Sequence, residues 1–140
     1  MDIVRMAMDI AYQAHAGQTD KAGKPYIMHP FTVALKQTND YAKCAALLHD
    51  VVEDSDYTID DLKSFGFPEE VIKAVQLLTH IEGVEYFDYI KAISENDLAK
   101  SVKLADLSHN SDLTRLEIVS DKDIKRVEKY KKAMQYLQSV

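Results

Sequence analysis

Cysteine, glycine and proline are all scarce in this chain of 140 residues. The single cysteine, Cys44, cannot form a disulfide within the chain, which favours a reducing, cytoplasmic location. Four glycines and three prolines leave few points at which the chain can turn sharply. The apolar runs fall well short of the ~20 residues that a helix needs to cross a bilayer, and the charged N-terminal segment lacks the apolar core of a signal peptide. No membrane partner is therefore expected.

Positive charge is in deficit as well. The chain carries 17 Lys and Arg residues against 23 Asp and Glu residues, which gives a formal net charge of -6. A surface that binds nucleic acid normally has an excess of basic residues, so a nucleic-acid polymer is not an expected partner. A small anionic substrate is compatible with this composition, because a bound metal ion can reverse the sign of the local field.

Helical periodicity is widespread, whereas no clear strand alternation is evident. Apolar residues almost surround the segment 40–52, which should be the central helix, and the amphipathic last segment should pack on the bundle. The pattern predicts an all-α fold, a compact multi-helix bundle that forms one domain over residues 1–140. Its oligomeric state is left open. Helices are expected over 2–15, from His29, over 40–52, from the capping box at Thr58 to Gly66, and over 68–79, 86–95, 97–116 and 121–138, with loops at 17–28 and 80–85.

The stretch LLHDVVEDSD, residues 47–56, places several ionisable side chains beside apolar ones. Divalent metals bind neutral imidazole and ionised carboxylate groups, and His49 and Asp50 supply one of each. On a continuous helix these two residues lie about 100° apart, so one ion must sit over their shared edge. Taken alone, the dipeptide is more often part of a solvated helix end.

Two further features change that balance. In KLADLSHN, residues 103–110, Asp106 and Asn110 lie one helical turn apart beside an apolar face. Polar groups in that position are either hydrogen-bonded to each other or part of a site. His29 follows an apolar stretch and precedes a proline that restricts its backbone. Three such features in one short chain favour a common site.

The order PYIxHP, LLHDVVED and VKLADLxHN resembles the HD-domain phosphohydrolases, specifically the hydrolase domain of the RelA/SpoT type, which cleaves the 3′-pyrophosphate from (p)ppGpp. The resemblance extends over about residues 5–116 and includes AHAGQ at 14–18. It implies one divalent metal ion, usually Mn²⁺, held by His29, His49, Asp50 and Asp106. Imidazole and carboxylate ligands suit a first-row divalent ion with open positions for water and substrate.

The same resemblance implies roles for four other residues. Glu53 and Asp54 match a pair that would orient or deprotonate the attacking water, and which of them is the base is left open. Asn110 and Lys21 match residues that contact a small-molecule nucleotide substrate. The reaction implied is therefore a metal-dependent hydrolysis of (p)ppGpp.

This sequence departs from the family at the expected purine site. Asp20 stands where the family usually has an arginine that stacks on guanine, and Asp112 stands where it often has another, although Arg115 is near. An aspartate offers neither a stacking plane nor a phosphate donor, and it repels anions. Hydrolysis of another nucleotide or phosphoester is therefore an alternative. A metal-stabilised module that binds a nucleotide without turnover is a third, less favoured because Glu53 and Asp54 are present.

The remaining candidates are expected to be structural. These are Lys24 and Lys103 as solvated lysines, Tyr86 and Tyr89 as core or rim rather than pocket residues, His15 in a structural hydrogen bond, His80 and His109 without a role, and Cys44 as an inert buried thiol.

Overall fold

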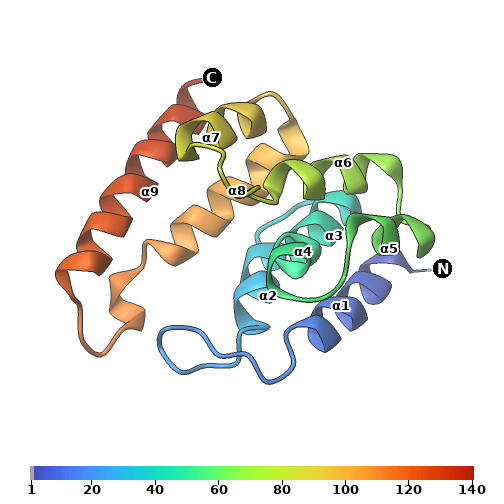
Figure 1. Cartoon of the computed structure of the whole chain (residues 1–140), viewed down its shortest axis with the longest axis horizontal. Coiled ribbons are helices and arrows are strands. Elements are labelled where there is room, and N and C mark those ends of the chain that lie inside the picture. The colour runs from blue at the N-terminus through green and yellow to red at the C-terminus, as the bar shows by residue number, and fades with distance from the viewer. Residues whose placement is uncertain (1) are drawn as a thin grey trace.

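The computed structural model describes residues 2–140, and helices make up its frame (Figure 1). The all-α prediction is confirmed: across residues 2–140 the only extended pairing is an isolated bridge between Thr19 and Pro25. No helix in this part of the chain is long and apolar enough to cross a membrane. The elements are α1 Ile3–Ala14, α2 Met28–Leu35, α3 Asp40–Leu48, α4 Val51–Asp54, α5 Ile59–Ser64, α6 Glu69–Leu78, α7 Tyr86–Ser94, α8 Asp97–Asn110, the 3₁₀ turn Leu113–Arg115 and α9 Asp121–Ser139.

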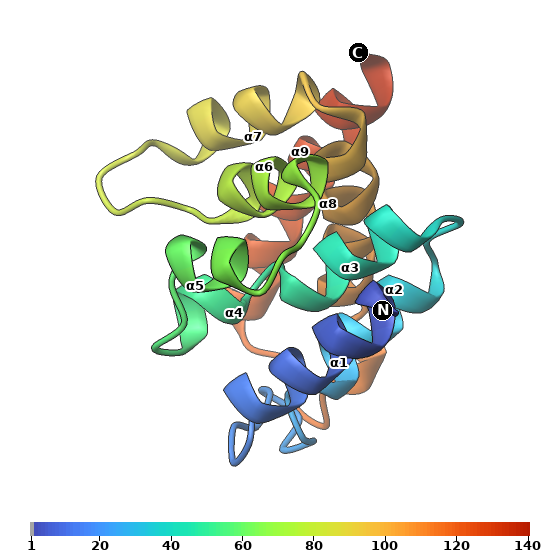
Figure 2. The ribbon, with the colours of Figure 1, turned by 90° about the vertical axis from the view of Figure 1, so that its right-hand side faces the viewer.

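Helix α3 is the central helix, as its composition predicts. It packs against α1, α2, α6 and α8, and each of its apolar residues from Ala42 onward is buried. Alanines and a cysteine at 42 and 44–46 keep its surface narrow, which allows four helices to approach it closely. In Figure 2, α1 lies below α3, and both α6 and α7 lie above α3.

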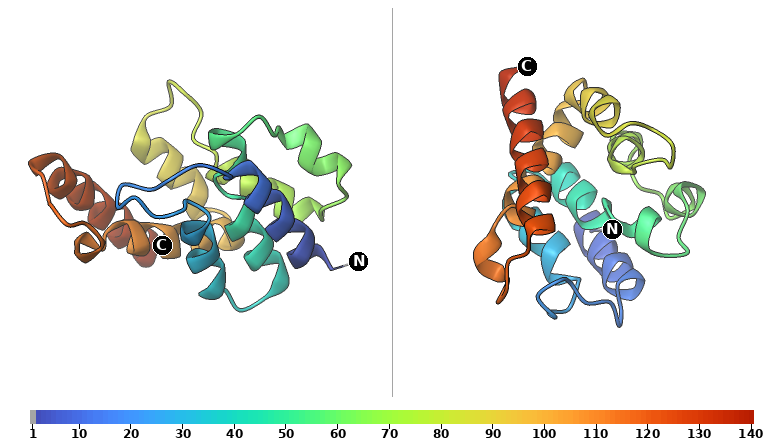
Figure 3. Two further views of the ribbon diagram at one scale, coloured as in Figure 1. Left: turned by 90° about the horizontal axis from the view of Figure 1, so that it is seen from below. Right: turned by 60° about the vertical axis from the view of Figure 1, so that its left-hand side comes forward.

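Helix α8 is the second hub of the bundle. It contacts α2, α3 and α6 on one side and α7 and α9 on the other. The long helix α9 runs along the outside of the molecule (Figure 3, right), and its packing against α7 and α8 confirms that it is part of the bundle. Helices α3 and α8 therefore contact each other and most of the other helices, so side chains on them are held by packing from several directions.

Side-chain caps set most of the helix starts that the sequence predicts. Asn39 caps α3 by accepting the backbone N–H of Ala42 at 2.9 Å. Thr58 and Ser120 open α5 and α9 with capping boxes in which Asp61 and Asp123 take the usual place of glutamate. The capping box at Thr58 was predicted from the sequence, and the caps at Asn39 and Ser120 are equally local in sequence.

Two predicted helices end earlier than their apolar pattern suggests. The segment 40–52 is broken between Leu48 and Val51, where Asp50 adopts φ −105° and ψ −2°. The segment 97–116 ends at Asn110 and continues only as a 3₁₀ turn, after Ser111. Both breaks lie beside residues predicted to form the site, and in both the tertiary contacts described below override helical periodicity.

Candidate metal centre and active site

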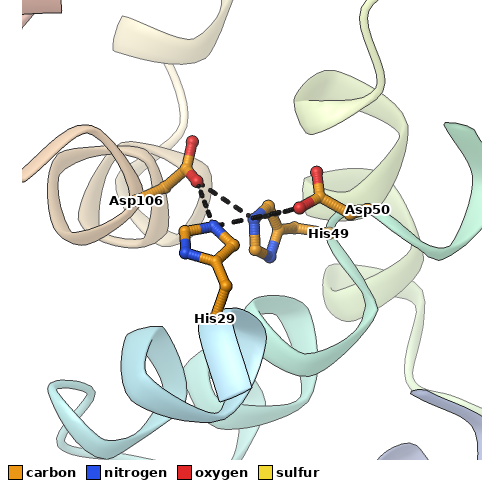
Figure 4. A group of neighbouring side chains, drawn as sticks. All are labelled: His29, His49, Asp50 and Asp106. Atoms are coloured by element: carbon orange, nitrogen blue, oxygen red, sulfur yellow. Dashed lines mark hydrogen bonds and ion pairs between the residues drawn. The ribbon is translucent and has the colours of Figure 1, made fainter. Parts of the chain in front are cut away.

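Four side chains from three parts of the chain converge at the junction of α2, α3, α4 and α8 (Figure 4). His29 comes from α2, His49 and Asp50 from the break between α3 and α4, and Asp106 from α8. Each offers one ligand atom, and these atoms all lie within 4.8 Å of one another. The four residues predicted as metal ligands are therefore brought together, and they could hold one divalent ion.

The break after α3 explains how two consecutive residues reach one point. Because the helix does not continue through His49 and Asp50, their side chains are not held 100° apart as on a regular helix. The Nδ1 of His49 donates to the carbonyl oxygen of Ala46 at 2.5 Å. This bond fixes the ring so that its Nε2 lies 3.1 Å from Asp50 Oδ2 and 3.3 Å from Asp106 Oδ1.

The donor set fits a cation. With Nδ1 of His49 committed as a donor, its Nε2 presents a lone pair to two carboxylate oxygens unless a proton or a cation lies between them. His29 Nε2 faces Asp106 Oδ1 in the same way at 2.7 Å. The two histidines and Asp106 are buried and Asp50 is half-buried, so solvent screens the charges of this cluster only weakly. Two imidazoles and two carboxylates are a ligand set for a first-row divalent ion.

Neighbouring groups keep the two carboxylates ionised. Burial opposes the charge on Asp106, but Lys103, whose Nζ lies 3.0 Å from Oδ2, and the two histidines hold the pKa of Asp106 well below its usual value. Burial likewise opposes the charge on Asp50, but His49 and a 2.5 Å hydrogen bond from the hydroxyl of Tyr26 lower its pKa. Metal ligands must be deprotonated, and both aspartates meet this requirement.

Glu53 and Asp54 line different cavities. The Glu53 carboxylate lines the same cavity as Asp50 and Asp106 and accepts the backbone N–H of His80. Asp54 lines a separate groove beside Gln18, whose side chain donates to the Asp54 carbonyl at 2.7 Å. Partial burial and the charge of Asp50 raise the pKa of both carboxyl groups.

The metal centre opens into a cleft made of two neighbouring cavities that share Tyr26, Asn110 and Tyr130. The inner cavity, of about 180 Å³, holds Asp50, Glu53 and Asp106, and the outer cavity, of about 350 Å³, lies under the α1–α2 and α8–α9 loops. Asn110, a predicted substrate residue, borders both cavities and donates to Asp106 at 3.2 Å, and Lys21 borders the outer one. The inner cavity is completed by Tyr26, His80, Tyr86, Tyr89, Lys103, Asn110 and Tyr130.

Lys103 is not the solvated lysine that the sequence suggests. Its side chain is only 12% exposed, its Nζ binds Asp106, and it lies 5.1 Å from the centre of the Tyr89 ring. Tyr89 belongs to the buried core and Tyr86 packs against it, as expected. Both also line the inner cavity, so the expectation that they are not pocket residues is wrong. The spacing of Lys103 three residues before Asp106 on one helix was the signal in the sequence.

His80 and His109, which were expected to have no role, both contact residues of the site. The His80 ring stacks on Tyr89 at 4.4 Å, and its backbone holds Glu53. The Nδ1 of His109 lies 2.7 Å from the Nδ1 of His29, and burial lowers the pKa of His109 to about 4. No local pattern identifies these contacts, since their partners lie on other helices.

Three of the structural expectations are met. His15 forms a hydrogen bond of 2.8 Å with Gln18, and Lys24 is exposed. Cys44 is a free, buried thiol, and burial raises its pKa to about 12.

Asp20 does not present a free negative charge to the cleft. Its Oδ1 accepts the backbone N–H groups of Ala22 and Lys24, both at 2.9 Å, and its Oδ2 accepts Arg115 Nη2 at 3.0 Å. Asp112 instead caps the 3₁₀ turn through Thr114. The expected repulsion at position 20 is therefore wrong, because Arg115, which lines the same outer cavity, neutralises it. The α9 residues Arg126 and Tyr130 line this cavity too and were not predicted.

Comparison with known proteins agrees with this geometry. A family model described as HD domain matches residues 7–133. The bifunctional (p)ppGpp synthase/hydrolase SpoT of Escherichia coli (strain K12) is 35% identical over an alignment 122 positions long, and the match covers 76% of this chain and 17% of that protein. The guanosine-3′,5′-bis(diphosphate) 3′-pyrophosphohydrolase of Aquifex aeolicus (strain VF5) is 40% identical over an alignment 87 positions long, and the match covers 59% of this chain and 12% of that protein. The chain thus spans less than a fifth of the length of these curated relatives.

A solved structure is similar over nearly the whole chain. It is that of a metazoan orthologue of SpoT described as hydrolysing ppGpp and acting in starvation responses. The TM-score is 0.76 at 25% sequence identity, and the match covers 98% of this chain and 85% of that one.

Proposed function

Because this chain belongs to the HD-domain family, whose model matches residues 7–133, we propose that it is a metal-dependent hydrolase of (p)ppGpp. The observation that carries the proposal is the position of the four-ligand centre in a cleft whose outer end holds cationic side chains. The names of the curated relatives and of the solved neighbour support the substrate. In the proposed reaction, water breaks the bond between the ribose 3′ oxygen and phosphorus, releasing pyrophosphate and GDP or GTP.

In this proposal, His29, His49, Asp50 and Asp106 hold one divalent ion. Mn²⁺ is the proposed native ion because the resemblance to the RelA/SpoT-type hydrolases implies it, and imidazole and carboxylate donors are compatible with a first-row divalent ion. A bound ion of this kind supplies Lewis acidity and makes a water molecule more acidic. The protein's own part is to keep both carboxylates ionised and both imidazoles correctly turned.

Glu53 and Asp54 are the proposed groups that orient or deprotonate the water. A general base works best when its pKa lies near the operating pH, and both carboxyl groups have a raised pKa. Glu53 is the better placed of the two, because its side chain shares the inner cavity with Asp50 and Asp106. Asp54 borders the adjoining groove and suits a supporting role.

Lys103 and Asn110 are proposed to act on the phosphate end of the substrate. Both line the inner cavity, and Lys103 carries a positive charge that burial does not remove, because Asp106 raises its pKa. A fixed cation in a shielded cavity stabilises charge that develops on phosphoryl oxygens. Lys21 and Arg115 line the outer cavity and are proposed to contact the rest of the nucleotide.

We propose further that residues 1–140 act as one domain in the cytoplasm. The family match spans most of the chain, and the buried thiol of Cys44 needs no oxidising compartment.

A second candidate is hydrolysis of a different nucleotide or phosphoester by the same centre. It is favoured by Asp20, which stands where a guanine-stacking arginine is expected and instead holds Arg115. A module that binds a nucleotide without turnover is the third candidate.

One assay separates the three candidates. Mn²⁺-loaded protein is incubated with ppGpp and with a panel of other nucleotides, and products are resolved by anion-exchange chromatography. We expect pyrophosphate and GDP from ppGpp, and no release by Asp50→Ala. Asp9→Ala is the matched control, because it makes the same change at an exposed carboxylate on α1 that borders none of the cavities described above. Turnover of another nucleotide alone supports the second candidate, binding without any turnover supports the third, and full turnover by Asp50→Ala contradicts the metal assignment.

A further inference from the structure

His109 meets a ring nitrogen of His29 that does not face the metal centre. Figure 4 shows one nitrogen of His29 directed at Asp106 and the other turned away from the cluster. The first is Nε2, 2.7 Å from Asp106 Oδ1, and the second is Nδ1, 2.7 Å from the Nδ1 of His109. A histidine that binds a metal through one nitrogen carries its proton on the other, so the partner of His29 Nδ1 matters.

The geometry of the two rings is that of an in-plane hydrogen bond. Their planes differ by only 16°, and their centroids are 4.9 Å apart. The centroid distance exceeds the 2.7 Å between the two nitrogens by nearly two ring radii. The two centroids and the two nitrogens therefore lie almost on one line, and the rings meet edge to edge rather than face to face. An N–H in the plane of one ring then points at the in-plane lone pair of the other.

Such a contact holds one proton. Two N–H groups at this distance would collide, and two lone pairs would repel each other. When His29 Nε2 is a ligand, its Nδ1 must be the donor, and His109 must be neutral with its own proton on Nε2. The two tautomers are therefore coupled.

Without His109, the proton of His29 could lie on Nε2 instead of Nδ1. Asp106 Oδ1 is a charged acceptor 2.7 Å from Nε2, so a proton on Nε2 would form a strong hydrogen bond there. That proton would occupy the lone pair that a metal needs. An acceptor at Nδ1 shifts the balance toward the tautomer that can bind the ion.

The rest of the chain holds His109 in place for this contact. It lies three residues after Asp106 on α8, so one helix carries both a ligand and the partner of another ligand. Its carbonyl oxygen accepts Arg115 Nη1 at 3.0 Å, and Arg115 Nη2 is held by Asp20 at 3.0 Å. The helix end is thereby tied to the α1–α2 loop.

We propose that His109 is a positioning residue that accepts the Nδ1 proton of His29 and so holds His29 in its metal-binding tautomer. The inference rests on the proposed metal-dependent function, and it concerns how this chain prepares its own ligand. His109 itself does not contact the ion.

The first test is spectroscopic and needs no variant. The protein is labelled with ¹⁵N-histidine, loaded with diamagnetic Zn²⁺, and its ring nitrogens are assigned by NMR. We expect a protonated Nδ1 on His29, and on His109 a bare Nδ1 with the proton on Nε2. A protonated Nδ1 on His109 in the loaded protein overturns the proposal.

The second test compares Mn²⁺ affinities by titration calorimetry. His109→Phe keeps a ring but removes the acceptor, and we expect a loss of about 10- to 100-fold, the range for outer-sphere partners of metal ligands. His109→Asn places an oxygen near the Nδ1 position and should recover most of the affinity. Ser108→Ala, a change at an exposed neighbour on α8, should leave it unchanged. Equal affinities of wild type and His109→Phe overturn the proposal.

The outcomes separate this inference from the proposed function. Wild-type protein that hydrolyses ppGpp but binds Mn²⁺ as tightly as His109→Phe contradicts only the role of His109. Protein that shows the expected tautomers and affinities but leaves ppGpp intact contradicts only the substrate. Wild type that binds neither Zn²⁺ nor Mn²⁺ contradicts both.

Discussion

Replacing Lys103 with methionine tests how the charge of Asp106 is balanced. The change keeps an unbranched apolar side chain against Tyr89 but removes the ammonium group 3.0 Å from Asp106 Oδ2. Breaking a buried ion pair by removing one partner costs about 3–5 kcal/mol. Asp106 retains its contacts with His29, His49 and Asn110, so we expect a loss of about 2–3 kcal/mol in metal-free protein.

This loss is large enough to measure by thermal unfolding. At roughly 2–4 °C per kcal/mol for a domain slightly larger than this one, the metal-free variant should melt roughly 5–10 °C below wild type. Added Mn²⁺ should narrow the difference, because a cation beside Asp106 replaces the missing charge. Hydrolysis by the loaded variant should fall by about 10- to 100-fold, as for other partners of metal ligands.

Lys24→Met is the matched control, since it removes the same charge from an exposed side chain. It should leave both the melting temperature and the hydrolysis rate close to wild type. If metal-free Lys103→Met has the same melting temperature as wild type, the ion pair with Asp106 does not stabilise the fold. Lys103 would then not balance the charge of Asp106.

Three other predictions concern the carboxylates and the metal. Glu53→Gln keeps the acceptor for the His80 N–H, and it should abolish most hydrolysis while making metal-free protein modestly more stable at pH 7. The sign follows because folding raises the pKa of Glu53, so the ionised carboxylate destabilises the folded state at pH 7. The gain in stability of Glu53→Gln should vanish below pH ~4.5, where the carboxyl of wild type is protonated in both the folded and the unfolded state. Urea unfolding of both proteins at pH 7 and below pH ~4.5 would show this difference. Asp20→Asn keeps the acceptor for the loop amides but loses the ion pair with Arg115, so KM should rise about 5-fold with kcat unchanged, and a fall in kcat alone would contradict this role. Chelation of the metal should lower the melting temperature reversibly, and an unchanged value would argue against a metal in the folded state.

Local features of the sequence determined the helices and the identity of the proposed ligands. Caps such as Asn39 and Thr58 bind backbone groups within three residues of themselves, so they act without any contact from a distant part of the chain. The apolar pattern of α3 likewise marks it as central without reference to any partner. The proposed ligands were identified because their motifs resemble those of the RelA/SpoT-type hydrolases. The chemistry of imidazole and carboxylate side chains was compatible with that assignment but did not select it.

Tertiary structure alone decided how those residues are used. Helical periodicity predicted one helix through His49 and Asp50, but in the structure the chain breaks there, where the two side chains meet His29 and Asp106. His109 looked ordinary because its partner His29 lies on another helix. Lys103 has one partner, Asp106, on its own helix, but its contact with Tyr89 comes from another helix and could not be read from the spacing. A periodic pattern reports which face of a helix is apolar, and it carries no information about which side chain of another helix will meet that face. Such contacts between helices determine the burial of Lys103 and the proposed tautomer of His29.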